Sequence, residues 1–296
     1  MRELADGGVF NTLAGQPTDD SELALMLARS IVKSGRYDAE TAAFAYAWWL
    51  DSHPFDAGNT TRAALGPALA AAKAGKSAAA AARKAASMSS QANGALMRLS
   101  PLAVFAWSHT PEETAKLARE DAALTHPDPV CCDANAVFAI AVSHAIKSGA
   151  TPATVFEFAR GWASQNKCHP EVLATLDAAR DAAPKCEGRN IGWVRVALQN
   201  AFYELLHAPT LEEALVRTVG RGGDTDTNAA ITGALLGAVH GRDGVPMRWR
   251  KLVLTCRPLS AASGAKHLRP KPLWPVDLLL LAERLLLLGA DDKLKA

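Results

Sequence analysis

Apolar residues recur along the chain with helical spacing. From Ser21 onward, Leu23, Met26, Leu27 and Ile31 follow the i, i+3, i+4 rule that places side chains on one face of a helix. No segment alternates apolar and polar residues over several positions, as a half-buried strand would, and no fixed repeat is visible. The pattern predicts further helices over about 38–51, 62–88 with a break near Gly66-Pro67, 111–124, 131–147, 152–164, 170–182, 191–206 and 228–240.

Polar segments that contain glycine or proline separate these predicted helices. They cover residues 1–17, 54–61, 89–101 and 221–227, and five prolines interrupt the segment between residues 246 and 275. The length of 296 residues and the continuous helical pattern predict an all-α fold with one domain over residues 1–296.

Composition supports this fold class and narrows the functions. Hydrophobic residues make up 49% of the chain and aromatic residues only 6%, so aliphatic residues and alanine, the strongest helix former, must build the core. A net charge of +2 with both signs interspersed gives no nucleic-acid footprint. Five cysteines without disulfide or metal spacing, and an N-terminus without an apolar signal sequence, predict a cytoplasmic protein. The apolar segment 276–288 contains Glu283-Arg284 and is too short to cross a bilayer, so it predicts a buried helix and no membrane association.

Two adjacent aspartates, Asp19 and Asp20, stand directly before the first predicted helix in the stretch "TDDSEL". Threonine and aspartate are preferred N-cap residues, and Asp19 with Glu22 has the spacing of a capping box. Acidic groups in a first turn also interact favourably with the helix dipole. Taken alone, this stretch favours a helix cap.

A second acidic group, "GGDTDT", precedes the predicted helix at 228–240. A cap employs one side chain, or two with a capping box, whereas Asp224, Asp226 and Thr227 crowd into a single turn. Neighbouring carboxylates repel each other unless a cation or a proton lies between them. Gly222 and Gly223, just before them, would allow the backbone to approach a ligand closely.

Together the two acidic groups offer four carboxylates and two hydroxyls. Oxygen donors of this kind suit Mg²⁺, Mn²⁺ or Ca²⁺, and no set of His and Cys residues indicates zinc. They would suffice for two divalent cations about 3.5–4 Å apart, as in two-metal hydrolases. Two unrelated caps explain the residues about equally well, so both interpretations stay open. The donors are Thr18, Asp19, Asp20, Asp224, Asp226 and Thr227.

A series of motifs resembles the ADP-ribosylglycohydrolase family over nearly the whole chain. They are "GQPTDDSELAL", "PFDAGNTTRAAL", "NGALMRLSPLAVF", "LTHPDPVCCDAN", "GWVRVALQNAFYELL", "RGGDTDTNAAITGALLGA" and "GVPMRWRKLV". The family includes dinitrogenase-reductase-activating glycohydrolases and the hydrolases of ADP-ribosyl-arginine and ADP-ribosyl-serine. The resemblance implies a compact orthogonal helical bundle with a binuclear Mg²⁺ or Mn²⁺ centre at the base of a cleft.

The resemblance also implies roles for individual residues. The six oxygen donors named above would hold the two cations, and Asp20 or Asp226 would transfer protons as the catalytic residue. His126 would line the ADP-ribose pocket, and the glycine pair Gly222 and Gly223 adjoins it. The segment Gln91, Ala92, Asn93, Gly94, Ala95 and Leu96 matches the loop that wraps the diphosphate and distal ribose of ADP-ribose.

Two neighbouring groups have less specific expectations. Arg98 could neutralise a diphosphate, but pairing with a buried acid is the favoured interpretation. Asp56, Asn59 and Thr60 of "PFDAGNTT" are expected to fix their loop beside the metal-bearing helices.

The activity implied by the resemblance is hydrolysis of the N- or O-glycosidic bond between ADP-ribose and an acceptor. Arginine is the first choice, because "RGGDTDT" and "PFDAGNTT" look like the dinitrogenase-reductase branch. The expected partner is the ADP-ribose moiety of a modified protein or small molecule, and a monomer is favoured. Family members usually begin with a glycine-rich helix some tens of residues before "TDD", so this helix is expected to be missing here. A non-catalytic ADP-ribose-binding or structural member of the family is the alternative.

Overall fold

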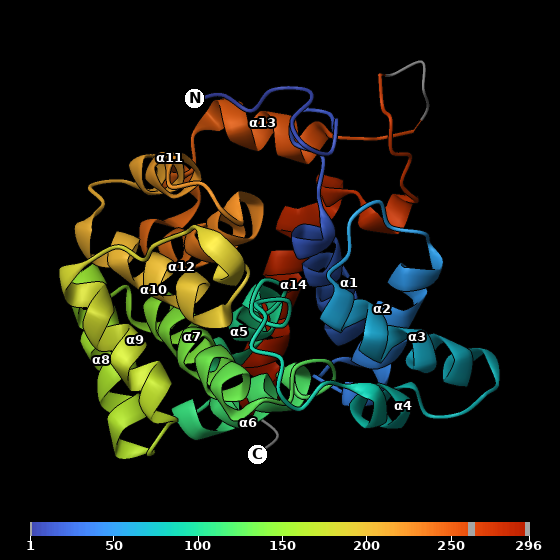
Figure 1. Ribbon diagram of the computed structural model, residues 1–296, viewed down its shortest axis with the longest axis horizontal. Helices are drawn as coiled ribbons and strands as arrows, with labels where there is room; N and C mark the ends of the chain where they lie inside the picture. The colour runs from blue at the N-terminus through green and yellow to red at the C-terminus, as the bar shows by residue number, and fades with distance from the viewer. Residues whose placement is uncertain (1, 260–263, 294–296) are drawn as a thin grey trace.

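The computed structural model describes residues 2–259 and 264–293, and helices dominate both ranges (Figure 1). Within them, β-pairing is limited to two isolated bridges, Gly7 with Thr12 and Ala92 with Trp193. The all-α prediction is therefore confirmed. The helices are α1 (Asp19–Ser34), α2 (Ala39–Asp51), α3 (Asn59–Lys73), α4 (Ala78–Ala85), α5 (Ser100–Phe105), α6 (Pro111–Ala122), α7 (Pro129–Ser148), α8 (Pro152–Gln165), α9 (Pro170–Asp181), α10 (Val194–His207), α11 (Leu211–Gly220), α12 (Thr225–Gly244), α13 (Met247–Thr255) and α14 (Leu278–Lys293).

Local sequence explains where several helices begin and end. α6 begins behind Thr110, whose hydroxyl accepts a hydrogen bond from the amide of Glu113 while the Glu113 carboxylate accepts one from the amide of Thr110. α1 ends at Gly35 and α7 at Gly149, and both glycines adopt the left-handed conformation that closes a helix without steric strain.

The predicted break at Gly66-Pro67 is wrong, because α3 continues through both residues. Proline removes one amide donor and leaves the carbonyl four residues earlier, at Ala63, without its helical partner. Ala63 and Pro67 both lie on the exposed face of α3, where water can solvate that carbonyl. The chain breaks instead at residues 74–77. α11 and α13 were not predicted, because at 10 and 9 residues they are too short to show a clear period.

The prediction of a buried helix over 276–288 is only half right. In α14, Leu281 and Leu285 are buried, but Leu279, Leu280 and Leu287 are 49%, 48% and 60% exposed. A run of leucines satisfies any period, so it does not reveal that only one face of this helix packs against the protein.

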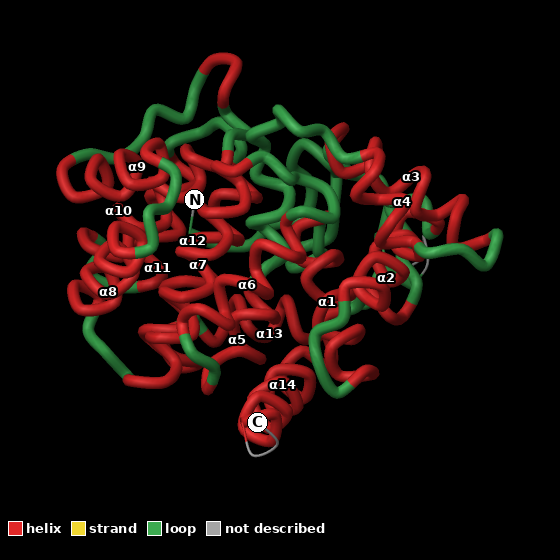
Figure 2. Tube along the Cα trace, turned by 90° about the horizontal axis from the view of Figure 1, so that it is seen from below, coloured by secondary structure: helices red, strands yellow, loops and turns green. Residues whose placement is uncertain are grey.

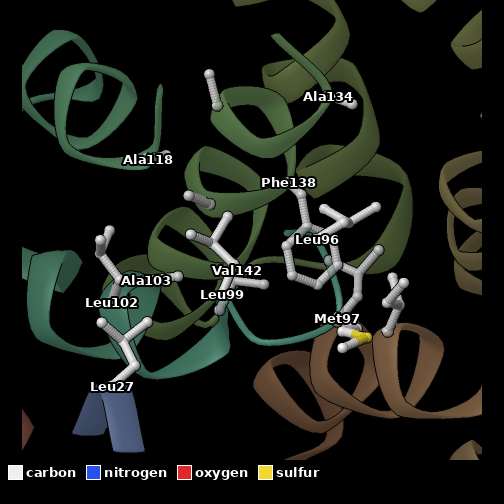
Figure 3. Packing of buried hydrophobic residues seen from close by; sticks show 14 of the residues in the cluster. Leu27, Leu96, Met97, Leu99, Leu102, Ala103, Ala118, Ala134, Phe138 and Val142 are labelled. Carbon is white, nitrogen blue, oxygen red and sulfur yellow. The ribbon is translucent and has the colours of Figure 1, made fainter. Parts of the chain in front are cut away.

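α7 occupies the centre of the core. It packs against α5, α6, α8, α10 and α12, and Figure 3 shows its Phe138 and Val142 among Leu96 and Leu99 of the preceding segment. By length and composition α7 is apolar enough to cross a membrane, but 72% of its apolar window is buried against other helices. This burial is typical of a helix in the core of a fold.

The arrangement brings two distant helix N-termini together. α1–α4 form one side of the molecule and α8–α12 the other, with α5 and α7 between them (Figure 1). α1 packs directly against α12, and loops gather along one edge between the two sides (Figure 2). The acidic groups at the N-termini of α1 and α12 therefore meet, although more than two hundred residues separate them.

Candidate active site

The first acidic group does not cap α1. Thr18 is the N-cap residue, but its side chain makes no capping hydrogen bond. Its hydroxyl instead donates to Oδ2 of Asp20 over 2.8 Å. Asp19 and Asp20 lie inside the first turn and are buried. The capping box predicted from Asp19 and Glu22 is therefore wrong.

The second acidic group likewise does not cap α12. Asp224 stands at the N-cap position without a capping hydrogen bond from its side chain. Its Oδ2 atom accepts a hydrogen bond of 2.8 Å from Nδ2 of Asn93. Thr227, one turn into the helix, is buried and hydrogen-bonds to Asp20 of the first group. Neither group is explained by helix capping.

Burial and mutual repulsion raise the pKa values of these carboxyl groups. Burial is the main cause that raises the pKa of Asp19 to about 8, followed by repulsion from Asp20, Asp56 and Asp226. Burial and then Asp226 raise the pKa of Asp20 to about 7, against the opposing hydrogen bonds from two threonine hydroxyls. The carboxylates thus form one interacting unit, the acidic cluster of Asp19, Asp20, Asp56, Asp224 and Asp226.

Asp56 is the member of the cluster to which sequence reasoning gave only a loop-fixing role. Burial followed by repulsion from Asp226 raises the pKa of Asp56, and its interaction with the Asp19 carboxyl group opposes this rise. The "PFD" motif was the available signal, but nothing in the sequence placed it beside Asp19.

The oxygen donors of the acidic cluster fit a hard divalent cation. Oδ1 of Asp20 is buried without a hydrogen-bond partner, which is costly unless another charge satisfies it. Among residues 2–259 and 264–293, no group of three or more His, Cys, Asp or Glu side chains is arranged to hold a metal ion. The predicted pair of cations remains a prediction.

The predicted substrate loop is held next to the acidic cluster by a second loop. The amide of Asn93 donates to the carbonyl of Gly192 over 3.0 Å, and the amide of Val194 donates to the carbonyl of Gln91 over 2.8 Å. Ala92 and Trp193 form the bridge between them. With its side chain on Asp224, Asn93 connects both loops to the cluster.

The remaining residues of the predicted loop differ in what they contact. Gly94 lies against His126, since a Cβ atom there would stand 3.0 Å from Cε1 of the imidazole and 2.9 Å from Oγ1 of Thr61. The side chains of Ala95 and Leu96 point into the core, and the amide of Leu96 donates to the carbonyl of Asn93. At Leu96, therefore, neither the side chain nor the amide is presented to a ligand.

His126 is buried and neutral. Its Nδ1 atom lies 2.8 Å from the hydroxyl of Thr125. Burial, with a smaller contribution from the charge of Arg98, lowers the pKa of His126 to about 3. At neutral pH the imidazole can exchange hydrogen bonds with a ligand but carries no positive charge for a phosphate.

The comparisons with known proteins point to one family. A family model described as ADP-ribosylglycohydrolase matches residues 1–288. The chain belongs to the ADP-ribosylglycohydrolase family. An ADP-ribosyl-[dinitrogen reductase] glycohydrolase of Rhodospirillum rubrum is 28% identical over 249 residues, which cover 84% of this chain and 77% of that protein. The ADP-ribosylarginine hydrolase Tri1 of Pseudomonas putida is 24% identical, over 84% of this chain and 65% of its own. A solved ADP-ribosylglycohydrolase-related protein complex matches with a TM-score of 0.75 and 27% identity, covering 97% of this chain and 87% of the other.

In this member of the ADP-ribosylglycohydrolase family, Arg98 has a structural role. Its guanidinium is fully buried and pairs with Asp121, with Nε 3.1 Å from Oδ2. Nη1 donates to the hydroxyl of Thr125 over 2.9 Å, and the guanidinium lies 4.3 Å from the ring centre of Tyr46. The favoured interpretation, a buried ion pair, is confirmed. Arg98 acts on the site only through Thr125, which orients His126.

A cavity of about 520 Å³ reaches the acidic cluster of this glycohydrolase-family chain. Thr18, Asp20 and Asp226 line it, together with aliphatic side chains from α1, α5 and α14. Among the described residues that line the cavity, none belongs to the 91–96 loop. The cavity and Asn93 therefore contact different members of the acidic cluster.

The glycine pair before α12 offers a direct test of the packing around the site. Gly222 and Gly223 have φ angles of +74° and +73°. A Cβ atom on Gly223 would stand 2.3 Å from the carbonyl oxygen of Cys186, whereas one on Gly222 would meet nothing within 4 Å. Gly223 is thus restricted by backbone packing as well as by conformation.

We expect Gly223→Ala to lower the free energy of unfolding by about 3 kcal/mol, because left-handed strain and a steric clash add together. Gly222→Ala, the matched control, should cost only about 1 kcal/mol of strain. Urea unfolding of both variants measures the difference. Equal losses would contradict the close approach of Cys186.

Proposed function

We propose that this chain is a metal-dependent hydrolase that cleaves the glycosidic bond between ADP-ribose and an acceptor, in the first place an arginine side chain of a protein. The observation that carries the proposal is the meeting of two acidic groups at helix N-termini that neither group caps. A protein retains such a costly set of buried carboxylates where they bind or react with something.

The six predicted donors, Thr18, Asp19, Asp20, Asp224, Asp226 and Thr227, would hold two Mg²⁺ or Mn²⁺ ions. When bound, divalent cations supply Lewis acidity and lower the pKa of water. The acidic cluster itself supplies negative charge where the ribose develops oxocarbenium character as its glycosidic bond breaks. Asp20 or Asp226 would accept the proton of the attacking water or pass a proton to the leaving group.

The loop of Asn93 would orient the ADP-ribose moiety beside these carboxylates. Gly94 keeps the backbone close to the neutral imidazole of His126, which can hydrogen-bond to a ribose or phosphate oxygen. Backbone amides in a glycine-bearing turn suit a diphosphate. Because Asn93 contacts both this loop and Asp224, it would set the distance between the ADP-ribose and the reacting centre.

The choice of arginine rests on the relatives. One is named for hydrolysis of ADP-ribosylarginine and another for ADP-ribosyl-[dinitrogen reductase]. Acceptor groups are contacted by loops at the rim of a site, which vary within a family. Serine, a nucleobase and small ADP-ribosyl metabolites are therefore included as competing substrates in the test.

The test is a panel of substrates with defined ADP-ribosyl linkages, assayed with Mg²⁺, with Mn²⁺ and with chelator. We expect release of ADP-ribose from the arginine linkage in the presence of a divalent cation only. Calorimetric binding of ADP-ribose without hydrolysis of any linkage would support the alternative, a non-catalytic ADP-ribose-binding member of the family. Equal turnover in chelator would contradict the metal dependence.

A further inference from the structure

A buried arginine from the C-terminal part of the chain binds the first turn of α1. Arg269 donates from Nε to Oε1 of Glu22 over 2.7 Å and from Nη2 to Oε2 over 2.8 Å. Both side chains are almost completely buried. Glu22 follows Asp20 by two residues on α1, so this fork of two hydrogen bonds fixes the turn that carries Asp19 and Asp20.

The same guanidinium also binds the start of the loop that carries Asp56. Nη1 donates to the carbonyls of Ser52 and His53 over 2.8 and 3.2 Å, and Nη2 donates to the hydroxyl of Ser52 over 2.8 Å. His53 has a φ angle of +54°, an unfavourable conformation for a residue with a side chain. Arg269 therefore holds this loop where a strained residue redirects the chain.

His267, two residues before Arg269, reinforces the same two loops. Its ring stacks on Phe55, with centres 4.3 Å apart and planes inclined by 21°. Its carbonyl accepts a hydrogen bond of 2.8 Å from Nε2 of Gln16, just before the Thr18 turn. The segment 267–269 thus contacts the chain beside Asp19 and the chain beside Asp56.

These contacts have a geometric function more than a stabilising one. A buried ion pair recovers little more than the free energy lost when its charges leave water. The planar guanidinium, however, fixes several acceptors at set directions, which the ammonium group of lysine cannot do. Asp19 lies three residues before Glu22 and Asp56 three residues after His53. Their two carboxyl groups repel each other when both are ionised, so their spacing needs external support.

We propose that Arg269 is a positioning residue that sets the spacing between Asp19 and Asp56 by tying Glu22 to the turn at Ser52 and His53. The inference rests on the proposed function, in which the acidic cluster binds the divalent cations.

The first test is Arg269→Lys in the full chain, with Arg29→Lys as the matched control. Arg29 also ties α1 to the C-terminal part of the chain, through Asp277 and the carbonyl of Pro272, but it does not contact the Ser52 turn. We expect Arg269→Lys to weaken Mn²⁺ binding, measured by calorimetry, about tenfold. Its kcat should recover at saturating Mn²⁺, whereas Arg29→Lys should leave Mn²⁺ affinity unchanged. An unchanged affinity in Arg269→Lys, or equal losses in both variants, would overturn the proposal.

The second test does not need metal or substrate. Hydrogen exchange of the metal-free protein should become faster for the amides of residues 55–58 in Arg269→Lys and stay unchanged in Arg29→Lys. Slow exchange in Arg269→Lys would overturn the positioning role even if the wild type binds Mn²⁺. Faster exchange in a protein whose wild type binds no Mn²⁺ would instead contradict the proposed function and leave the positioning role standing.

A milder variant covers the case in which Arg269→Lys fails to fold. Ser52→Ala removes the hydroxyl that accepts from Nη2 and that also donates to the carbonyl of Trp49 over 2.6 Å, and it leaves the bonds between Arg269 and Glu22 in place. It should change Mn²⁺ affinity and the exchange of residues 55–58 in the same direction but by a smaller factor. No change in either measurement would count against the proposal.

Discussion

Replacing Asp224 and Asp226 together by asparagine is expected to reduce kcat/KM for ADP-ribosylarginine by about 10³-fold or more. Asparagine keeps the shape of each side chain but removes two charges from the acidic cluster. The variant would therefore lose two of the six proposed cation ligands, one of which, Asp226, is also a proposed proton acceptor. Repulsion on Asp19 and Asp20 decreases at the same time, so the metal-free variant should be at least as stable as the wild type.

Asp243→Asn is the control for this experiment. Asp243 lies near the other end of α12, with a side chain that is 92% exposed and paired with Arg250. The same substitution there should leave activity unchanged, because surface ion pairs contribute little. Thermal unfolding and circular dichroism check that both variants fold. Retained turnover in a folded double variant would eliminate the acidic cluster as the reaction centre.

The metal-free protein is expected to lose stability as the pH rises from 6.5 to 8. Burial and repulsion raise the pKa of Asp20 to about 7 and that of Asp19 to about 8, whereas both are near 3.8 in the unfolded chain. The folded state thus holds more protons than the unfolded state in this range, and stability falls with pH. The pKa of His126 is lowered to about 3, so this residue makes stability rise with pH. It does so only below the ordinary histidine pKa of 6.5, which is outside the range considered.

The same protons couple metal binding to pH. Cations bind ionised carboxylates, so each proton released on binding makes the apparent affinity rise about tenfold per pH unit. Mn²⁺ titrations between pH 6.5 and 8 measure how the apparent affinity changes with pH. Thermal unfolding in chelator over the same range measures how the stability of the metal-free protein changes with pH. Asp19→Asn removes the group with the higher pKa and should flatten both. A metal-free stability that stays constant or rises over this range would contradict the mutual repulsion of the buried carboxylates.

Each segment of the site is supported by an arginine that pairs with a buried carboxylate. The Arg98–Asp121 pair supports the segment of His126. The Arg221–Glu204 pair supports the start of the "GGDTDT" loop, and the Arg269–Glu22 pair supports the "TDD" turn. For Arg98, pairing with a buried acid was predicted, but the acid itself was not named, because an arginine in a motif is often paired with an acid. The partners of Arg221 and Arg269 were not predicted.

The sequence by itself determined the helical fold class and the two acidic groups as candidate ligands. Both follow from interactions within a few residues, since helical periodicity and the oxygen content of a turn are local properties. It also carried the motifs from which family membership was inferred, and the family match confirmed it.

Only the tertiary structure decided between a cap and a cluster. The charge of Asp226 raises the pKa of Asp19 across 207 positions of sequence, and that influence depends on burial and on distance in space. The same holds for Asp56 beside Asp19 and for Arg269, whose partner Glu22 is 247 positions away. Capping is set by the nearest turn of backbone, whereas repulsion between buried charges is set by the packing of α1 against α12.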